Sequence, residues 1–385
     1  MSKEKGTKLK NSSFLPILFM IIGGMCSFFG IRIIDSSLRG MGWNNGNRFI
    51  SIVIMITFMY LATYIQIIVH EGGHLICGII SGYKFVSFRI GSLMIIFNGS
   101  NYKIKKFNIK GTGGQCLMMP PGSDSDNFPY VLFNLGGIIA NTVFSLLCLL
   151  IYKLLPQVNL FSVFLIILFI IGITFALING IPMYLGGIPN DGKNALFLGK
   201  DKVTKNAFWL QLYNNGLIAN GTRLTDISEE LFQMSDQADL NNPLICTLGV
   251  FKFSYLHDKR LFDEAKEMGE YLLVNAPGIL EIHKNELRCE LLFYEIMGSC
   301  RKEEIERLYT PQLINYIKAT SSYVSRKRLI YAYALLVEGN VSKAKNELKK
   351  FEQTAKTYPY EVEVQAEREL LAMIDGKWIQ LSNGS

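Results

Sequence analysis

The residues of this chain best suited to chemistry are two histidines and a glutamate in the stretch IQIIVHEGGHLICGIISGYK, residues 65–84. His70 and His74 are four positions apart, so on a helix both imidazoles leave the same face one turn apart, as two ligands of one metal ion must. Glu71 follows His70 directly, and in zinc hydrolases a glutamate at this offset is the general base that deprotonates the attacking water. The stretch therefore has the HExxH pattern and predicts zinc-dependent hydrolysis.

A short pattern of this kind also arises by chance, as two solvated histidines on a soluble helix. Here the surrounding run is apolar enough for lipid, and ionisable side chains inside a membrane usually face a cavity and mark a functional site. The whole chain has four histidines, and two of them are in this stretch. The context favours the functional interpretation.

The apolar residues of this 385-residue chain are concentrated in its first half. Four runs each hold about the 20 apolar residues that cross about 30 Å of hydrocarbon, at residues 14–34, 49–69, 131–155 and 160–178. No such run follows Lys200. We therefore expect a mostly α protein: a polytopic α-helical membrane domain with a small β-hairpin element, followed by a soluble all-α helical-repeat domain.

Basic residues determine the predicted orientation in the membrane. Four lysines lie within residues 3–10, and a second basic cluster lies between residues 84 and 110. Because Lys and Arg are enriched in cytoplasmic segments, we expect both termini on the cytoplasmic side of a bacterial cell membrane. The first apolar run is long and has no small-residue cleavage site, so we expect an uncleaved span. The net charge of +7 lies mainly in these flanks, which indicates contact with anionic lipid and no nucleic-acid binding.

Residues 83–121 alternate apolar and polar side chains, a pattern typical of β-strands, and Asn98-Gly99 is a hairpin turn signal. The glycine-rich sequence GTGGQCLMMPPG, residues 111–122, closes this region. It could present an unpaired strand edge to an extended peptide, or it could be an ordinary connecting loop.

Two polar residues, one within the third apolar run and one after the fourth, each have more than one interpretation. Asn141, in the middle of the third run, could link two helices by hydrogen bonds, or donate to a substrate carbonyl or oxyanion. Asp191 follows the fourth run in a segment of glycines and prolines, and an Asn-Asp-Gly sequence is often a turn or helix cap. The predicted topology, however, brings Asp191 to the membrane face of His70 and His74, where a catalytic zinc needs a third protein ligand.

Taken together and in this order, three segments resemble the site-2 protease family of intramembrane zinc metalloproteases. HEGGHLICGIISGYKF resembles the family's HExGH helix, NLGGIIAN its second core helix with a central asparagine, and NGIPMYLGGIPNDG its asparagine-proline and aspartate-glycine segment. The resemblance covers about residues 50–200. It implies that His70, His74 and Asp191 bind one zinc ion (Zn²⁺) per chain, that Glu71 is the catalytic base, and that Asn141 orients the substrate.

The predicted domains follow from the apolar runs and this resemblance. Residues 1–48 would form the N-terminal cytoplasmic tail, first span and outer loop, residues 49–200 the intramembrane metalloprotease core, and residues 201–385 a cytoplasmic domain. In the last part Ala265, Ile305 and Ala344 recur 40 and 39 residues apart within similar segments. This spacing predicts tetratricopeptide-like helix pairs, which could hold a peptide or protein partner in a groove or could only stabilise the protease.

The sequence therefore predicts a zinc-dependent endopeptidase that cleaves a membrane-spanning or membrane-inserted peptide near the cytoplasmic face. A helical substrate would have to unwind, and could pair with the glycine-rich edge around Gly113 and Gly114. An alternative is a catalytically inactive membrane protein that binds or sequesters a peptide or partner through its cytoplasmic repeats. A third interpretation keeps the zinc but takes its last ligand from Glu229 or Glu230.

Overall fold

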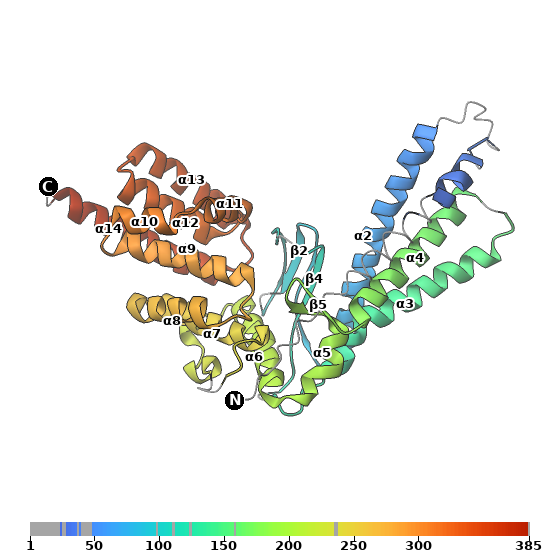
Figure 1. Ribbon diagram of the computed structural model, residues 1–385, viewed down its shortest axis with the longest axis horizontal. Helices are drawn as coiled ribbons and strands as arrows, with labels where there is room; N and C mark the ends of the chain where they lie inside the picture. The colour runs from blue at the N-terminus through green and yellow to red at the C-terminus, as the bar shows by residue number, and fades with distance from the viewer. Residues whose placement is uncertain are drawn as a thin grey trace, which may run out of the picture. The chain divides into compact units, whose positions relative to one another are not determined.

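The computed structural model describes residues 24, 28–36, 38–39, 48–97, 99–109, 112–122, 125–157, 159–234 and 238–383. These residues are mostly helical and include a small antiparallel sheet, as predicted (Figure 1). They divide into two compact units, Met1–His70 with Gly137–Asn179, and Glu71–Gly136 with Gly180–Ser385. The predicted first span, residues 14–34, lies largely outside the described residues, although residues 28–34 belong to a helical segment.

Among the described residues, three helices are long and apolar enough to cross a membrane: α2 (Arg48–Ile80), α3 (Tyr130–Leu154) and α4 (Leu160–Gly180). Their bounds lie close to those of three predicted runs, and α2 continues past residue 69 through the HEGGH sequence, which was predicted to be helical. Within the first unit they share an apolar core that includes Ala62 of α2, Cys148 of α3 and Leu168 of α4. Large apolar side chains such as Ile56 and Val143 also point outward, as lipid-facing residues do.

The second unit contains a four-stranded antiparallel sheet of order β3-β2-β1-β4, formed by β1 (Lys84–Ile90), β2 (Leu93–Phe97), β3 (Tyr102–Lys106) and β4 (Gly114–Met119). The predicted hairpin joins β2 to β3, and Gly99 there has a φ of 85°, which glycine adopts without strain. The sheet is larger than the small hairpin element predicted, because β4 also pairs with β1. Among the described strands β4 pairs only with β1, so residues 114–119 form an edge strand rather than a loop.

The remaining helices of the second unit are α5 (Asp191–Phe197), α6 (Lys202–Ala219), α7 (Pro243–Asp258), α8 (Phe262–Asn275), α9 (Glu281–Met297), α10 (Lys302–Leu308), α11 (Pro311–Ala319), α12 (Val324–Ala332), α13 (Val341–Thr357) and α14 (Glu361–Asn383). From α7 onward they stack in successive layers (Figure 1). The three residues of the predicted repeat, Ala265, Ile305 and Ala344, are buried in α8, α10 and α13, each the second helix of a pair. The assignment of these helix pairs as tetratricopeptide-like stays a prediction.

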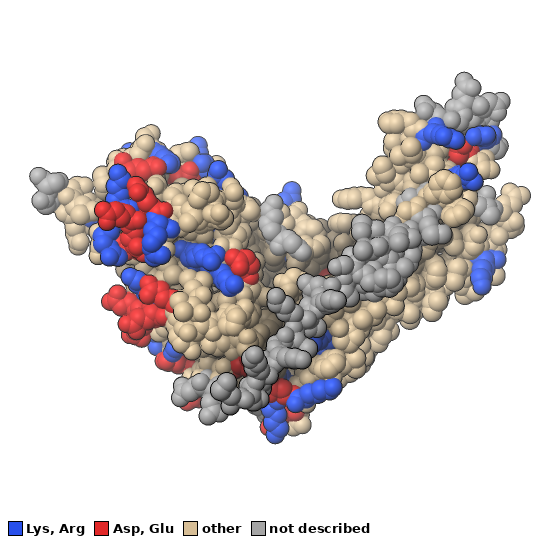
Figure 2. All heavy atoms as spheres, viewed as in Figure 1, with Lys and Arg blue, Asp and Glu red and all other residues tan. Residues whose placement is uncertain are grey.

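One face of the sheet packs on these helices. Met94 and Ile96 of β2 and Leu117 of β4 belong to the same apolar core as Phe253 of α7 and Leu287 of α9. Figure 2 shows acidic and basic side chains interspersed over the visible surface of the C-terminal helices, a distribution typical of a water-exposed surface. The sheet is therefore anchored to the C-terminal helices by the alternate apolar residues of its strands.

Candidate metal centre

The HEGGH sequence lies within α2, whose 33 residues run without a break. His70 and His74 therefore leave one face of this helix a turn apart, and both side chains are buried. Gly72 and Gly73 lie between the two histidines, and a glycine in a helix lets another backbone approach closely. A Cβ atom on Gly136 of α3 would lie 2.5 Å from the carbonyl oxygen of Gly73, so Gly136 has to be a glycine for the two helices to pack. A Cβ atom on Gly72 would meet no heavy atom of the described residues within 4 Å, apart from its chain neighbours and its own helix backbone.

Asn141 of α3 positions the first histidine. Its Oδ1 lies 2.8 Å from Nδ1 of His70, and its Nδ2 donates to the carbonyl oxygen and to Oε1 of Gln66, one turn before His70. A hydrogen bond from Nδ1–H to Oδ1 makes Nε2 the ligating nitrogen of the ring. Asn141 is fully buried and links α2 to α3, which is one of the two roles predicted for it. Its contact with a substrate stays a prediction.

A backbone carbonyl group positions the second histidine, His74, in the same way. Nδ1 of His74 lies 2.8 Å from the carbonyl oxygen of Phe133 in α3, and its Nε2 lies 3.4 Å from Oδ2 of Asp191. The Nδ1 bond again directs Nε2 toward the third predicted ligand.

Asp191 lies at the start of α5, directly after the residue that caps this helix. A short hairpin, β5 (Tyr184–Leu185) and β6 (Ile188–Pro189), follows α4 and leads into α5. Asn190 caps α5: its Oδ1 accepts from the backbone N–H of Lys193 and of Met183, and its Nδ2 donates to the carbonyl oxygen of Ile181. Because Asn190 does the capping, Asp191 is the first helical residue and does not cap the helix.

His70, His74 and Asp191 form a group that could hold a metal ion. Their donor atoms all lie within 4.8 Å of one another. Two imidazoles and one carboxylate form a ligand set typical of catalytic zinc, and tetrahedral bonds of about 2.0–2.1 Å would separate two ligand atoms by about 3.3 Å. The 3.4 Å between Nε2 of His74 and Oδ2 of Asp191 agrees with that separation.

No protein-family model, curated protein or solved structure matches this chain.

The predicted base, Glu71, is half-buried. Burial, together with the negative charge of Glu71, raises the pKa of the Cys116 thiol in β4 to about 12. The two alternative third ligands, Glu229 and Glu230, are not part of the group that could hold a metal. Glu229 instead forms an ion pair with Lys252.

Sequence reasoning missed three contributors to the site. Gln66, which is fully buried and bonded to Asn141, is a lone amide four positions before His70, and that spacing on one helix face could have revealed it. Gly137 contacts the His70 ring, and only its place beside Gly136 in NLGGIIAN hinted at close packing. The carbonyl group of Phe133 has no sequence signal, because every residue carries one.

Replacing Gly137 with alanine is expected to weaken metal binding. The new Cβ atom would lie 2.4 Å from Cε1 and 2.5 Å from Nδ1 of His70, so the imidazole must move and lose its bond to Asn141. Loss of a hydrogen bond that orients a metal ligand typically lowers metal affinity about 10- to 100-fold. Titration with a competing chelator measures the change. Gly72→Ala, on the histidine helix, should keep the wild-type affinity, and equal losses in both variants would contradict the role of Gly137.

Proposed function

We propose that this protein is a zinc-dependent intramembrane endopeptidase that cleaves a membrane-spanning or membrane-inserted peptide near the cytoplasmic face, as its resemblance to site-2 proteases implies. The observation that carries this proposal is the group formed by His70, His74 and Asp191, whose two histidines lie on a helix apolar enough to cross a membrane. Burying these side chains within an apolar span is costly, so such residues usually mark a functional site.

The chemistry follows from the residues around the group. Zinc at this position would polarise the scissile carbonyl and activate the attacking water. Glu71 would accept the proton of that water and return it to the leaving amine. Asn141 and the carbonyl of Phe133 would hold the two imidazoles in the orientation that presents Nε2.

The edge strand β4 could pair with an extended substrate. Peptide carbonyls in a helix are hidden by hydrogen bonds, so a helical substrate must unwind before cleavage. An unwound segment could add to the outer edge of β4 by main-chain hydrogen bonds. The charge of Glu71 contributes to the raised pKa of Cys116 in that strand, and in this proposal the bound segment would lie near the base.

In this proposal the predicted span at residues 14–34 crosses a bacterial cell membrane together with α2, α3 and α4, and with these four spans both chain termini are cytoplasmic. Lys84, Lys103 and Lys105 on the sheet are the basic residues expected on that side. The C-terminal helices would then be available to a cytoplasmic partner protein.

Metal analysis of the purified protein in detergent tests the proposal directly. We expect one zinc ion per chain, and removal by a chelator should abolish cleavage until zinc is restored, because in this proposal the zinc activates the attacking water. Protein that is folded but carries no stoichiometric zinc would instead support a catalytically inactive membrane protein that binds or sequesters a peptide.

A further inference from the structure

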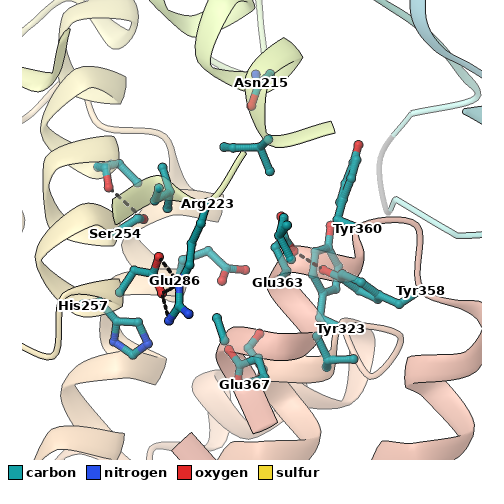
Figure 3. A pocket seen from close by; sticks show the side chains of 18 of the residues that line it. Asn215, Arg223, Ser254, His257, Glu286, Tyr323, Tyr358, Tyr360, Glu363 and Glu367 are labelled. Atoms are coloured by element: carbon teal, nitrogen blue, oxygen red, sulfur yellow. Dashed lines mark hydrogen bonds and ion pairs between the residues drawn. The ribbon is translucent and has the colours of Figure 1, made fainter. Parts of the chain in front are cut away.

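We propose that a cavity in the second unit binds an organic cation, a primary ammonium or guanidinium group on an apolar stem. The cavity has a volume of about 420 Å³ and is lined by residues of β4, α6, α7, α9, α12 and α14 (Figure 3). That volume lies within the range of small-molecule sites, about 300–1,000 Å³. None of the predicted metal ligands lines it, so this proposal holds whether or not the metal centre is catalytic.

Much of the cavity wall is apolar or aromatic. Leu117 of the sheet, Phe253 of α7 and Leu287 of α9 line it. Tyr358 and Tyr360, just before α14, lie on the same side of the cavity as Glu363 (Figure 3). The apolar side chains suit a hydrocarbon stem, and tyrosine rings attract a cation held over their faces.

Most of the charged side chains that line the cavity are acidic, and Arg223 is the basic one among them. Five carboxylates line the cavity: Asp258, Glu286, Glu290, Glu363 and Glu367. Four of them already have arginine partners. Asp258 lies 2.9 Å from Arg223, Glu286 pairs with Arg326, and Glu290 and Glu367 lie 2.7 and 2.8 Å from Arg328.

Glu363 is the exception among these carboxylates. It accepts a hydrogen bond of 2.8 Å from the hydroxyl of Tyr358, but it forms no ion pair with any lysine or arginine in the part of the chain that the structure describes. Burial, with the neighbouring charges of Glu367 and Glu286, raises the pKa of Glu363 to about 7. An ionised carboxylate in such surroundings is costly unless a cation pairs with it.

The other basic groups near the cavity do not supply that cation. His257 lines the cavity, but burial and the charge of Arg328 lower its pKa to about 3, so the ring is neutral at pH 7. Arg89 of β1 acts on Tyr360 electrostatically, yet its guanidinium donates to the carbonyl oxygens of Gly91 and Gly114. A ligand cation between Glu363 and the tyrosine rings would complete the charge pairing of the wall.

Calorimetric titration of the 385-residue chain in detergent tests this inference with two cationic probes. One is the peptide acetyl-Leu-Lys-Leu-amide, and the other is 4-phenylbutylamine. Their uncharged counterparts carry norleucine in place of lysine and a hydroxyl in place of the amine. We expect at least one cationic probe to bind about tenfold more tightly than its counterpart, because hydrogen bonds between charged groups are the stronger ones. Binding of the peptide alone identifies a basic peptide side chain as the ligand, and binding of the amine alone identifies a free amine.

Glu363→Gln keeps the shape of the side chain and removes its charge, so it should weaken binding of the cationic probe about tenfold. Glu361→Gln is the matched control, because Glu361 is exposed on the same helix and pairs with Lys103 outside the cavity. It should leave the affinity unchanged. Circular dichroism and thermal unfolding confirm that both variants are folded.

Three results would overturn the proposal: no binding of either cationic probe at millimolar concentration, equal affinity for charged and uncharged probes, or unchanged affinity in Glu363→Gln. If Glu363→Gln does not fold, Tyr360→Leu replaces it. Loss of that aromatic ring should lower the affinity for the cationic probe more than the affinity for the uncharged one. An equal loss of affinity for both probes would again overturn the proposal.

Discussion

Replacing Glu71 with glutamine is expected to lower the rate of peptide cleavage about 10²- to 10⁴-fold, the usual contribution of a general base, while zinc stays bound. The amide has nearly the same shape as the carboxylate but cannot take a proton from water at neutral pH. The hydrogen bonds that orient His70 and His74 come from Asn141 and Phe133, so the substitution leaves them in place.

The measurement starts from cells that express either the wild type or the Glu71→Gln variant. Mass spectrometry of their membrane peptides identifies segments that are cleaved only in cells with the wild type. A synthetic peptide with the sequence of such a segment then serves as the substrate for measuring the cleavage rate of each purified protein. Glu303→Gln, an exposed residue of α10, is the matched control and should cleave at the wild-type rate. Cleavage at the wild-type rate by the Glu71→Gln protein would exclude Glu71 as the base. Joint loss of zinc and activity would show that Glu71 acts on metal binding instead.

Replacing Asp191 with alanine should lower zinc affinity by more than about a hundredfold. Substitutions that only reorient a metal ligand typically cost 10- to 100-fold, and this one removes a ligand outright. It leaves two histidines on one helix, fewer than the three protein ligands of a typical catalytic zinc site. Helix α5 should keep its start, because Asn190 provides the cap and not Asp191.

Zinc content after dialysis and chelator competition measure the effect of Asp191→Ala. Asp226→Ala, at an exposed aspartate of the same unit, is the matched control and should retain one zinc per chain. Full occupancy in Asp191→Ala would favour another carboxylate, such as Glu229 or Glu230, as the third ligand. Loss of zinc with preserved helical content would support the ligand set of His70, His74 and Asp191.

Much of the fold follows from local features of the sequence. About 20 consecutive apolar residues predict a helix long enough to span a membrane wherever they occur. Helices α3 and α4 lie within a few residues of the predicted runs, and α2 extends the second run through the HEGGH sequence, which was predicted to be helical. The face shared by His70 and His74 follows from helical periodicity alone. The hairpin at Gly99 follows from the preference of glycine for positive φ.

The full sheet was less predictable, because pairing between distant strands depends on contacts that local patterns do not specify. Residues 114–119 could have been a loop or a strand, and their pairing with β1 decides for a strand. The same is true of Asn141. Its sequence is compatible with either predicted role, and only the positions of His70 and Gln66 show what its side chain atoms contact.

By itself, the sequence determined that two imidazoles and a glutamate share a segment apolar enough for a membrane helix, because spacing and hydropathy are properties of one continuous stretch. The tertiary structure alone decided that Asp191 meets His74, because 116 residues separate them and Asn190 had to take the capping role. It also decided which carboxylate in the cavity forms no ion pair with a lysine or arginine of the described residues. The sequence does not distinguish Glu363 from Glu367, since the partner of a buried charge depends on which helices pack together.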